Sequence, residues 1–128
     1  MPGLAIYLVQ GALLFFNSEY VRDRIRWVVS RMPPTTRWFI LDAEAMTTVD
    51  STAAAALEEV RLDLARRDIS FGLANLHSQP RKLLRQAGLL ANIGDEMLFE
   101  RVEDAALAFE NAQASASTAR DPMPVEID

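Results

Sequence analysis

The chain concentrates its reactive side chains in one short stretch between residues 42 and 52. Asp42 ends the apolar run 38–41, Glu44 follows it, and Asp50-Ser51-Thr52 stands directly before four consecutive alanines. This order predicts an apolar strand, a polar loop and an alanine-rich helix. Because a helix N-terminus carries unpaired N–H groups and the positive end of the helix dipole, such a junction favours phosphate or another anion. The alternative is that Asp50 or Ser51 only caps the helix, a role that most helices require.

Few other residue types in the chain support catalysis or metal binding. The absence of cysteine excludes disulfides, thiol catalysis and thiolate metal sites, and the single histidine, His77, excludes a histidine cluster. The carboxylates at 42, 44 and 50 lack the spacing of metal ligands, so we expect neither an enzyme nor a metal site. The sequence contains no P-loop and no Gly-x-Gly-x-x-Gly motif, which argues against a tight nucleotide site. A phosphate at Ser51 or Thr52 would be repelled by the nearby carboxylates unless Mg²⁺ accompanied it.

Length and composition are those of one globular domain. The chain has 128 residues, of which 50% are hydrophobic and 24% charged, enough for a single hydrophobic core. Its net charge of −5 and its lack of a basic stripe argue against a nucleic-acid partner. Trp27 and Trp38 are predicted to be core or interface aromatics, because no basic residues interleave with them as in a nucleic-acid groove. No apolar run reaches the ~18 residues that a membrane-spanning helix needs.

The elements that position the stretch 42–52 alternate between strands and helices. We predict strands at 4–9, 13–16, 37–42, 69–76 and 97–99, and helices at 17–32, 51–67, 80–88 and 102–112. The first two strands form a hairpin, Gly72 marks a close packing partner within its strand, and Gly88 ends a helix as a left-handed cap. The predicted apolar faces are Tyr20, Val21, Ile25 and Val28 in the first helix and Ala106, Leu107 and Phe109 in the last.

These elements predict an α/β fold with a mixed β-sheet, an N-terminal hairpin and about four helices. Residues 1–113 form the domain, and residues 114–128, which have no periodicity, form a disordered C-terminal tail. Sites in sheets with parallel strands usually lie outside the carboxyl ends of the strands. In this chain that edge holds the loop 42–52 and the loop 76–80, with His77 and Ser78.

Three segments of the chain, residues 12–19, 50–53 and 83–89, together resemble the STAS domain. This module is shared by SulP (sulfate permease) anion transporters and bacterial anti-sigma-factor antagonists. Asp50-Ser51-Thr52-Ala53 is similar to that family's Asp-Ser-Ser/Thr-Gly/Ala loop, and 83–89 to its Leu-x-x-x-Gly-Leu helix end. Segment 12–19 looks like the Pro-Leu-Phe-Phe-Ala-Asn-Ala-Glu segment of the transporter branch, with Ala12, Leu14 and Phe16 as departures. The resemblance covers about Pro2 to Phe109. The chain lacks the long insertion that animal members carry after the first helix. In this respect it resembles bacterial transporters.

The resemblance implies a non-enzymatic regulatory domain on the cytoplasmic side of the cell membrane. Its implied partners are the transmembrane domain of the same transporter, cytosolic regulatory proteins and a guanine nucleotide (GDP or GTP, with Mg²⁺). The implied nucleotide or anion site consists of Asp50, Ser51, Thr52, Ala53, His77 and Ser78. In the antagonist branch the second hydroxyl residue of the loop is phosphorylated, and that position is Thr52 here.

Two functions from different classes follow from these expectations. One is the regulatory STAS domain of a sulfate or other anion transporter, with nucleotide binding at the 42–54 loop. The other is a stand-alone regulator, similar to the anti-sigma-factor antagonists and switched by phosphorylation at Thr52. Met1-Pro2-Gly3 lies directly before the first predicted strand, which favours a domain cut from a longer transporter.

Overall fold

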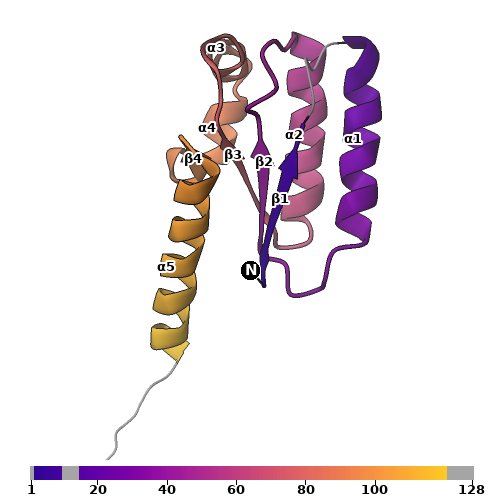
Figure 1. Ribbon diagram of the computed structural model, residues 1–128. Coiled ribbons are helices and arrows are strands. Elements are labelled where there is room, and N and C mark those ends of the chain that lie inside the picture. The colour runs from indigo at the N-terminus through magenta and orange to yellow at the C-terminus, as the bar shows by residue number, and fades with distance from the viewer. Residues whose placement is uncertain (1, 10–14, 121–128) are drawn as a thin grey trace, which may run out of the picture.

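The residues that the structure describes fold as a four-stranded sheet with helices on both faces. A computed structural model describes the backbone of residues 2–9 and 15–120 and the side chains of 2–9 and 17–115 (Figure 1). The strands are β1 (Leu4–Leu8), β2 (Trp38–Asp42), β3 (Ser70–Ala74) and β4 (Leu98–Phe99). The helices are α1 (Phe15–Ser30), α2 (Ser51–Ala65), α3 (Ser78–Gln86), α4 (Leu89–Ile93) and α5 (Val102–Arg120), and Asp95–Met97 forms a 3₁₀ turn.

The described strands are all parallel and lie in the order β1-β2-β3-β4. In this register Ile6, Ile40 and Gly72 lie side by side across the sheet. A Cβ atom at Gly72 would stand 2.7 Å from the carbonyl oxygen of Met97. The close packing partner predicted for this glycine is therefore confirmed.

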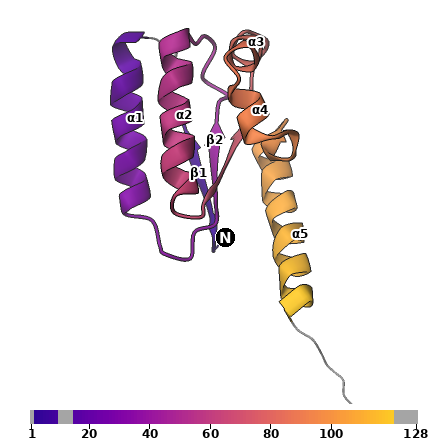
Figure 2. The same ribbon diagram turned by 180° about the vertical axis from the view of Figure 1, so that it is seen from behind.

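The main core lies on the sheet face that α1, α2, α3 and α4 cover, as Figure 2 shows from behind. Alternate strand residues point to this face, because side chains alternate along a strand. The Phe39 ring stacks between Tyr7 and Phe71, with ring centroids 6.2 Å and 6.3 Å apart. Ile25 and Val29 of α1 are buried against the same core.

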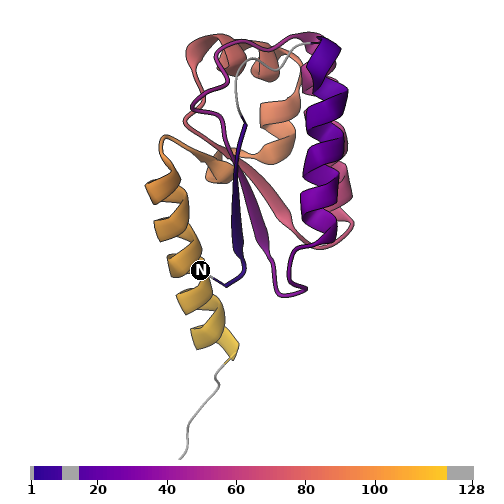
Figure 3. The same cartoon turned by 45° about the vertical axis from the view of Figure 1, so that its right-hand side comes forward.

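The opposite face packs against α5 (Figure 3). Trp38 lies between Phe99, at 6.2 Å, and Phe109, at 5.2 Å in an edge-on arrangement. Gly3, with φ +92°, brings the chain so close to α5 that a Cβ there would stand 2.8 Å from the Phe109 ring. This smaller cluster holds α5 on the sheet.

The α/β class is confirmed, but the described residues form no hairpin, and their sheet is parallel rather than mixed. Of the predicted second strand, Phe15 and Phe16 belong to α1 instead, and Leu13 and Leu14 lie outside the described residues. The reason is that an apolar run of four residues does not distinguish a strand from the first turn of a helix.

The helical predictions differ from the structure in three places. The apolar pattern predicts Tyr20 and Leu107 on buried faces, yet their exposed fractions are 70% and 58%. Gly88 has the predicted left-handed conformation, with φ +88°, but the chain continues directly into α4, which was not predicted. Helix α5 continues to Arg120, beyond the predicted end near residue 112, so the first part of the expected tail is helical. Residues 121–128 lie outside the described residues.

Candidate functional site

The candidate site is the sheet edge where β2 and β3 end and α2 and α3 begin, at the top of Figure 1. Two loops meet there: residues 43–50 after β2 and residues 75–77 after β3. Parallel strands bring their carboxyl ends to one edge, so two helix N-termini lie near each other.

Asp42 joins the two loops. Its Oδ1 accepts a hydrogen bond from the backbone N–H of Glu44 and another from the Asn75 side chain, each at 3.0 Å. Asn75 has φ +59°, in the left-handed region that asparagine tolerates better than most residues. The Asp42 carboxylate therefore stabilises both the turn after β2 and the loop after β3.

Gln79 makes a second connection between the loops. Its side-chain amide accepts from the Val49 N–H at 3.0 Å and donates to the Val49 carbonyl at 3.1 Å. The side chains of Val49 and Met46 are buried in the core. The loop 43–50 is thus held by the hydrogen bonds of Gln79 and by its own buried side chains, which fixes the start of α2.

Asp50 is the N-cap of α2, as the cap interpretation predicted. Its side chain accepts from the Ala53 N–H at 2.9 Å, which is the standard N-cap to N3 geometry. Ala53 itself is fully buried, so its side chain supports the edge from within the core. Ser51 is exposed and Thr52 half-buried, and their N–H groups donate to no oxygen within the described part of the chain. These two N–H groups are the ones available to an anion.

His77 occupies the N-cap position of α3 without making a side-chain cap hydrogen bond. Its Nε2 lies 2.5 Å from the Glu44 carbonyl oxygen. Because a carbonyl only accepts, Nε2 carries the hydrogen, and Nδ1 remains available as a second polar atom. Ser78, the first residue of α3, is exposed.

Two hollows flank this edge. One, of about 370 Å³, is lined by Glu44, Asn75, Leu76, His77, Arg81 and Glu100. Arg81 contributes a guanidinium there, and its Nη2 also donates to the Leu76 carbonyl at 3.4 Å. The other, of about 270 Å³, is lined by Ser51, Ala54, Ala55, Glu58, Ala87, Leu89 and Asn92. The hydrogen bonds from Arg61 hold the pKa of Glu58 below its ordinary value, and the Arg61 guanidinium compensates the charge of this carboxylate.

Neither of these two hollows carries a net positive charge. Glu44 and Glu100 outnumber Arg81 in the first, and the charged residue that lines the second is Glu58, which is paired with Arg61. Within the described ranges 2–9 and 15–120, no three histidine or acidic side chains gather as they would around a metal ion. The carboxylates of Asp42 and Asp50 hold backbone and amide groups instead.

The structure brings together the two loops that precede α2 and α3, through the Val49–Gln79 and Glu44–His77 contacts. Asp50 and His77 end these loops, and the other predicted site residues lie in the first helical turns that follow: Ser51, Thr52, Ala53 and Ser78. Asn75 and Arg81 also belong to this edge, although the sequence did not assign them to it. Gln79 lies in the predicted loop 76–80 but was not among the predicted site residues. An asparagine directly after a strand and a glutamine in the first helical turn were the available signals. Their partners, however, depend on tertiary contacts.

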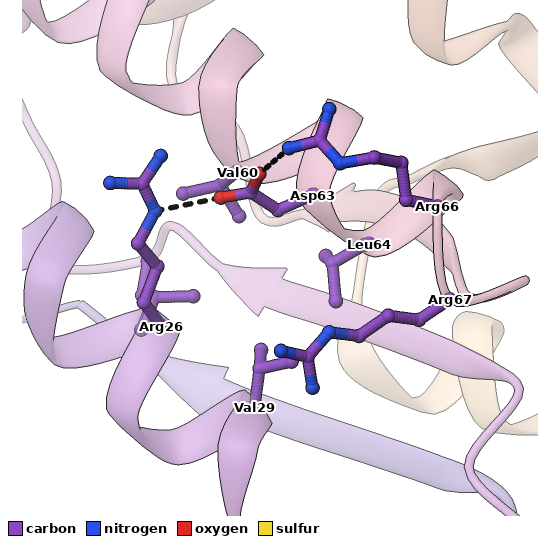
Figure 4. A pocket seen from close by; sticks show the side chains of 8 residues that line it. Arg26, Val29, Val60, Asp63, Leu64, Arg66 and Arg67 are labelled. Carbon is purple, nitrogen blue, oxygen red and sulfur yellow. Dashed lines mark hydrogen bonds and ion pairs between the residues drawn. The ribbon is translucent and has the colours of Figure 1, made fainter.

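Another hollow, of about 380 Å³, lies between α1 and α2 and is part of the scaffold rather than the edge (Figure 4). Asp63 accepts from Arg26 Nε at 2.7 Å and also from Arg66. The hydrogen bond to Asp63 raises the pKa of Arg26. These contacts tie α1 to α2 across the hollow.

The family model and the related proteins that match this chain agree with each other. The profile of the STAS domain family matches residues 1–105. A probable sulfate transporter of Mycobacterium tuberculosis is 39% identical over 109 residues, which cover 85% of this chain and 20% of that protein. Sulfate transporter 3.2 of Arabidopsis thaliana is 29% identical over 113 residues, with 82% and 18% covered. The chain thus spans about a fifth of the length of these relatives.

Solved structures share the fold at low identity. A sulfate transporter family protein from Wolinella succinogenes has a TM-score of 0.74 at 24% identity, covering 87% of this chain and 88% of that one. The murine anion transporter Slc26a9 has a TM-score of 0.76 at 24% identity, covering 88% and 18%. In the part of the chain that the structure describes, no helix combines the length and apolar character needed to cross a bilayer.

Proposed function

Because this chain belongs to the STAS domain family, we propose that it is the cytoplasmic regulatory domain of a sulfate or related anion transporter. The observation that carries this proposal is the 39% identity, over 85% of the chain, with a probable sulfate transporter. The 20% share of that protein is what a domain attached to a larger membrane-spanning part would cover. The domain acts by contact, with the transmembrane domain and with cytosolic regulatory proteins, and performs no catalysis.

The rigid edge at the start of α2 and α3 is the part of this domain suited to binding a guanine nucleotide. The Ser51 and Thr52 N–H groups offer a phosphate two donors at the positive end of α2. Asp50 keeps these groups in place by capping the helix, and His77 Nδ1 and the Ser78 hydroxyl offer polar contacts nearby. The affinity is modest because Glu44 and Glu58 lie in the flanking hollows, and Mg²⁺ bound with the phosphates reduces the repulsion.

The test is an NMR titration of the labelled domain with GDP and GTP, with and without Mg²⁺. We expect saturable shifts confined to residues 42–54 and 75–81. Ser51→Ala removes a hydroxyl at this edge and should weaken binding. Ser70→Ala removes an exposed hydroxyl at the opposite end of β3 and should not. Absence of saturation at millimolar nucleotide would exclude the nucleotide site while leaving the transporter assignment untouched.

The assignment to a transporter has a separate test. In cells expressing the full transporter, disrupting the edge with Gln79→Ala should change sulfate uptake while the protein still reaches the membrane. Unchanged uptake would contradict a regulatory role for this edge. The other predicted function, a free regulator phosphorylated at Thr52, requires the half-buried Thr52 hydroxyl to become accessible, and mass spectrometry after incubation with cell extract and ATP tests it.

A further inference from the structure

The solvent-facing side of α1 carries an unusual set of side chains. Trp27 lies two residues from each of the buried residues Ile25 and Val29, which places it on the opposite side of the helix. Its exposed fraction is nevertheless 48%. A large aromatic residue directly opposite the core is a typical anchor of a protein interface.

Two arginines flank this tryptophan. The guanidinium carbons of Arg24 and Arg31 stand 5.1 Å and 4.5 Å from the centre of the Trp27 ring. Neither arginine has an ion pair with a carboxylate among the residues that the structure describes. A guanidinium stacked on a ring keeps its in-plane N–H groups free to bind a carboxylate. We call Arg24, Trp27 and Arg31 the cationic stripe.

Helix α5 carries a similar arrangement with the opposite charge: an exposed apolar residue between two carboxylates. Leu107 lies two residues from each of the buried residues Ala105 and Phe109, so it points away from the sheet, with an exposed fraction of 58%. Glu103 and Glu110 flank it, both exposed and neither ion-paired within the described ranges. We call Glu103, Leu107 and Glu110 the anionic stripe.

The two stripes have the same spacing when one is read backwards. From Arg24 the steps are three residues to Trp27 and four to Arg31; from Glu110 they are three back to Leu107 and four back to Glu103. Arg31 is the first residue after α1, and its N–H still donates to the Val28 carbonyl at 3.0 Å. Each stripe therefore extends about 10.5 Å along the direction of its helix. In an antiparallel pair of helices, Trp27 packs on Leu107 while Arg24 meets Glu110 and Arg31 meets Glu103.

The stripes of one molecule cannot meet each other. Helix α1 covers one face of the sheet and α5 the other, and Figures 1 and 3 show them on opposite sides. We therefore propose that the cationic stripe of one copy binds the anionic stripe of a second copy, as an antiparallel α1–α5 contact. Since the two stripes differ, the contact is head-to-tail and can repeat from copy to copy.

Such a contact is weak and depends on salt. One pair of helix faces buries less than the ~1,200 Å² typical of stable interfaces, so association becomes visible only at high protein concentration. The two ion pairs are peripheral and solvent-exposed, and salt screens charges of this kind.

The experiment is sedimentation equilibrium of the 128-residue chain, at low salt and at about 0.5 M salt, where the screening length is only a few ångströms. At low salt and near-millimolar protein, we expect the average mass to rise above the monomer's 14.3 kDa, and to return to it at high salt. R24E/R31E and E103R/E110R should each lower the association constant at least about tenfold, because each brings like charges together.

An equimolar mixture of the two variants should associate again, since each supplies the charge that the other lacks. K82E/R85E, which makes the same charge change on exposed positions of α3, should associate like the unmodified chain. Circular dichroism checks that every variant is folded. A chain that stays monomeric at all concentrations overturns the proposal, as does a mixture that fails to associate or a K82E/R85E variant as impaired as R24E/R31E.

Discussion

At the scale of single residues, Asp50 combines a structural role with a position next to the candidate site. Its carboxylate satisfies the Ala53 N–H, and the neighbouring N–H groups of Ser51 and Thr52 remain available. The cap alone does not establish a ligand site, because caps of this kind are common. It does ensure that α2 begins at Ser51, so that these groups have a fixed direction.

Asp50→Ala should lower the free energy of unfolding by about 1 kcal/mol, within the range of 0.5–2 kcal/mol typical of lost caps. Urea denaturation of the domain measures this loss. Asp50→Asn is the matched control, since its amide oxygen can still accept from Ala53, and it should lose much less. Equal losses in both variants would show that charge, rather than the cap hydrogen bond, matters at this position.

At the scale of elements, most of the edge was predictable from local sequence and its internal connections were not. The apolar strand ending at Asp42, the cap at Asp50 and the close packing at Gly72 follow from residue type and position. The double hydrogen bond between Val49 and Gln79 joins residues 30 positions apart, and no local pattern specifies it.

The buried faces of α1 and α5 likewise could not be predicted from local sequence alone. Hydrophobicity alone predicts Tyr20 and Leu107 on apolar faces, but the side of each helix that is buried follows from angular position. The buried side contains Ile25 and Val29 in α1 and Ala105 and Phe109 in α5. Small Ala105 allows α5 to lie close to the sheet, and Leu107 then points outward. The two residues that the sequence misplaced are exposed, and Leu107 belongs to the anionic stripe.

Glu58 connects α2 with α4 and makes stability depend on pH. It accepts from Arg61 at 2.8 Å and 2.6 Å and from Asn92 at 3.2 Å. The Arg61 hydrogen bonds, together with its charge and the Asn92 contact, lower the pKa of Glu58 below 4.5 in the folded state. The stabilisation is therefore present above the unfolded-state pKa and is lost as the pH falls through the folded-state pKa.

Glu58→Gln should destabilise the domain by up to about 1 kcal/mol at neutral pH, as expected for a partly exposed ion pair. The difference from the unmodified chain should shrink as the pH falls below 4.5, where the native glutamate also becomes protonated. Urea denaturation at a series of pH values provides the comparison. Glu110→Gln, at an exposed glutamate without a described ion pair, serves as the control and should show little effect at any pH.

At the scale of the whole molecule, the two faces of the sheet are unequally supported. Four helices cover the larger core, whereas the other face depends on α5 and a small cluster around Trp38, Phe99 and Phe109. The loss of one anchor should therefore release α5 before the rest of the fold.

Phe109→Ala should cost about 3–5 kcal/mol, the range for removing a buried aromatic side chain. We expect hydrogen exchange to accelerate in α5 while α1 and α2 stay protected, because the main core does not include Phe109. Leu107→Ala, at an exposed position two residues away, should change stability by less than about 0.5 kcal/mol. Uniform loss of protection across all helices in Phe109→Ala would mean that the two faces unfold together.

The contacts of Gly3, directly before β1, determine how a pulling force would enter the domain. Its carbonyl accepts from the N–H groups of both Arg37 and Trp38, at 2.8 Å and 3.0 Å, and its α-carbon lies against the Phe109 ring. Tension that enters the domain through the N-terminal side of Gly3 would pass at once to the beginning of β2 and to the side of α5. The first strand, whose parallel bonds to β2 run along its length, would then be loaded in shear, the direction in which a ladder of hydrogen bonds shares the force.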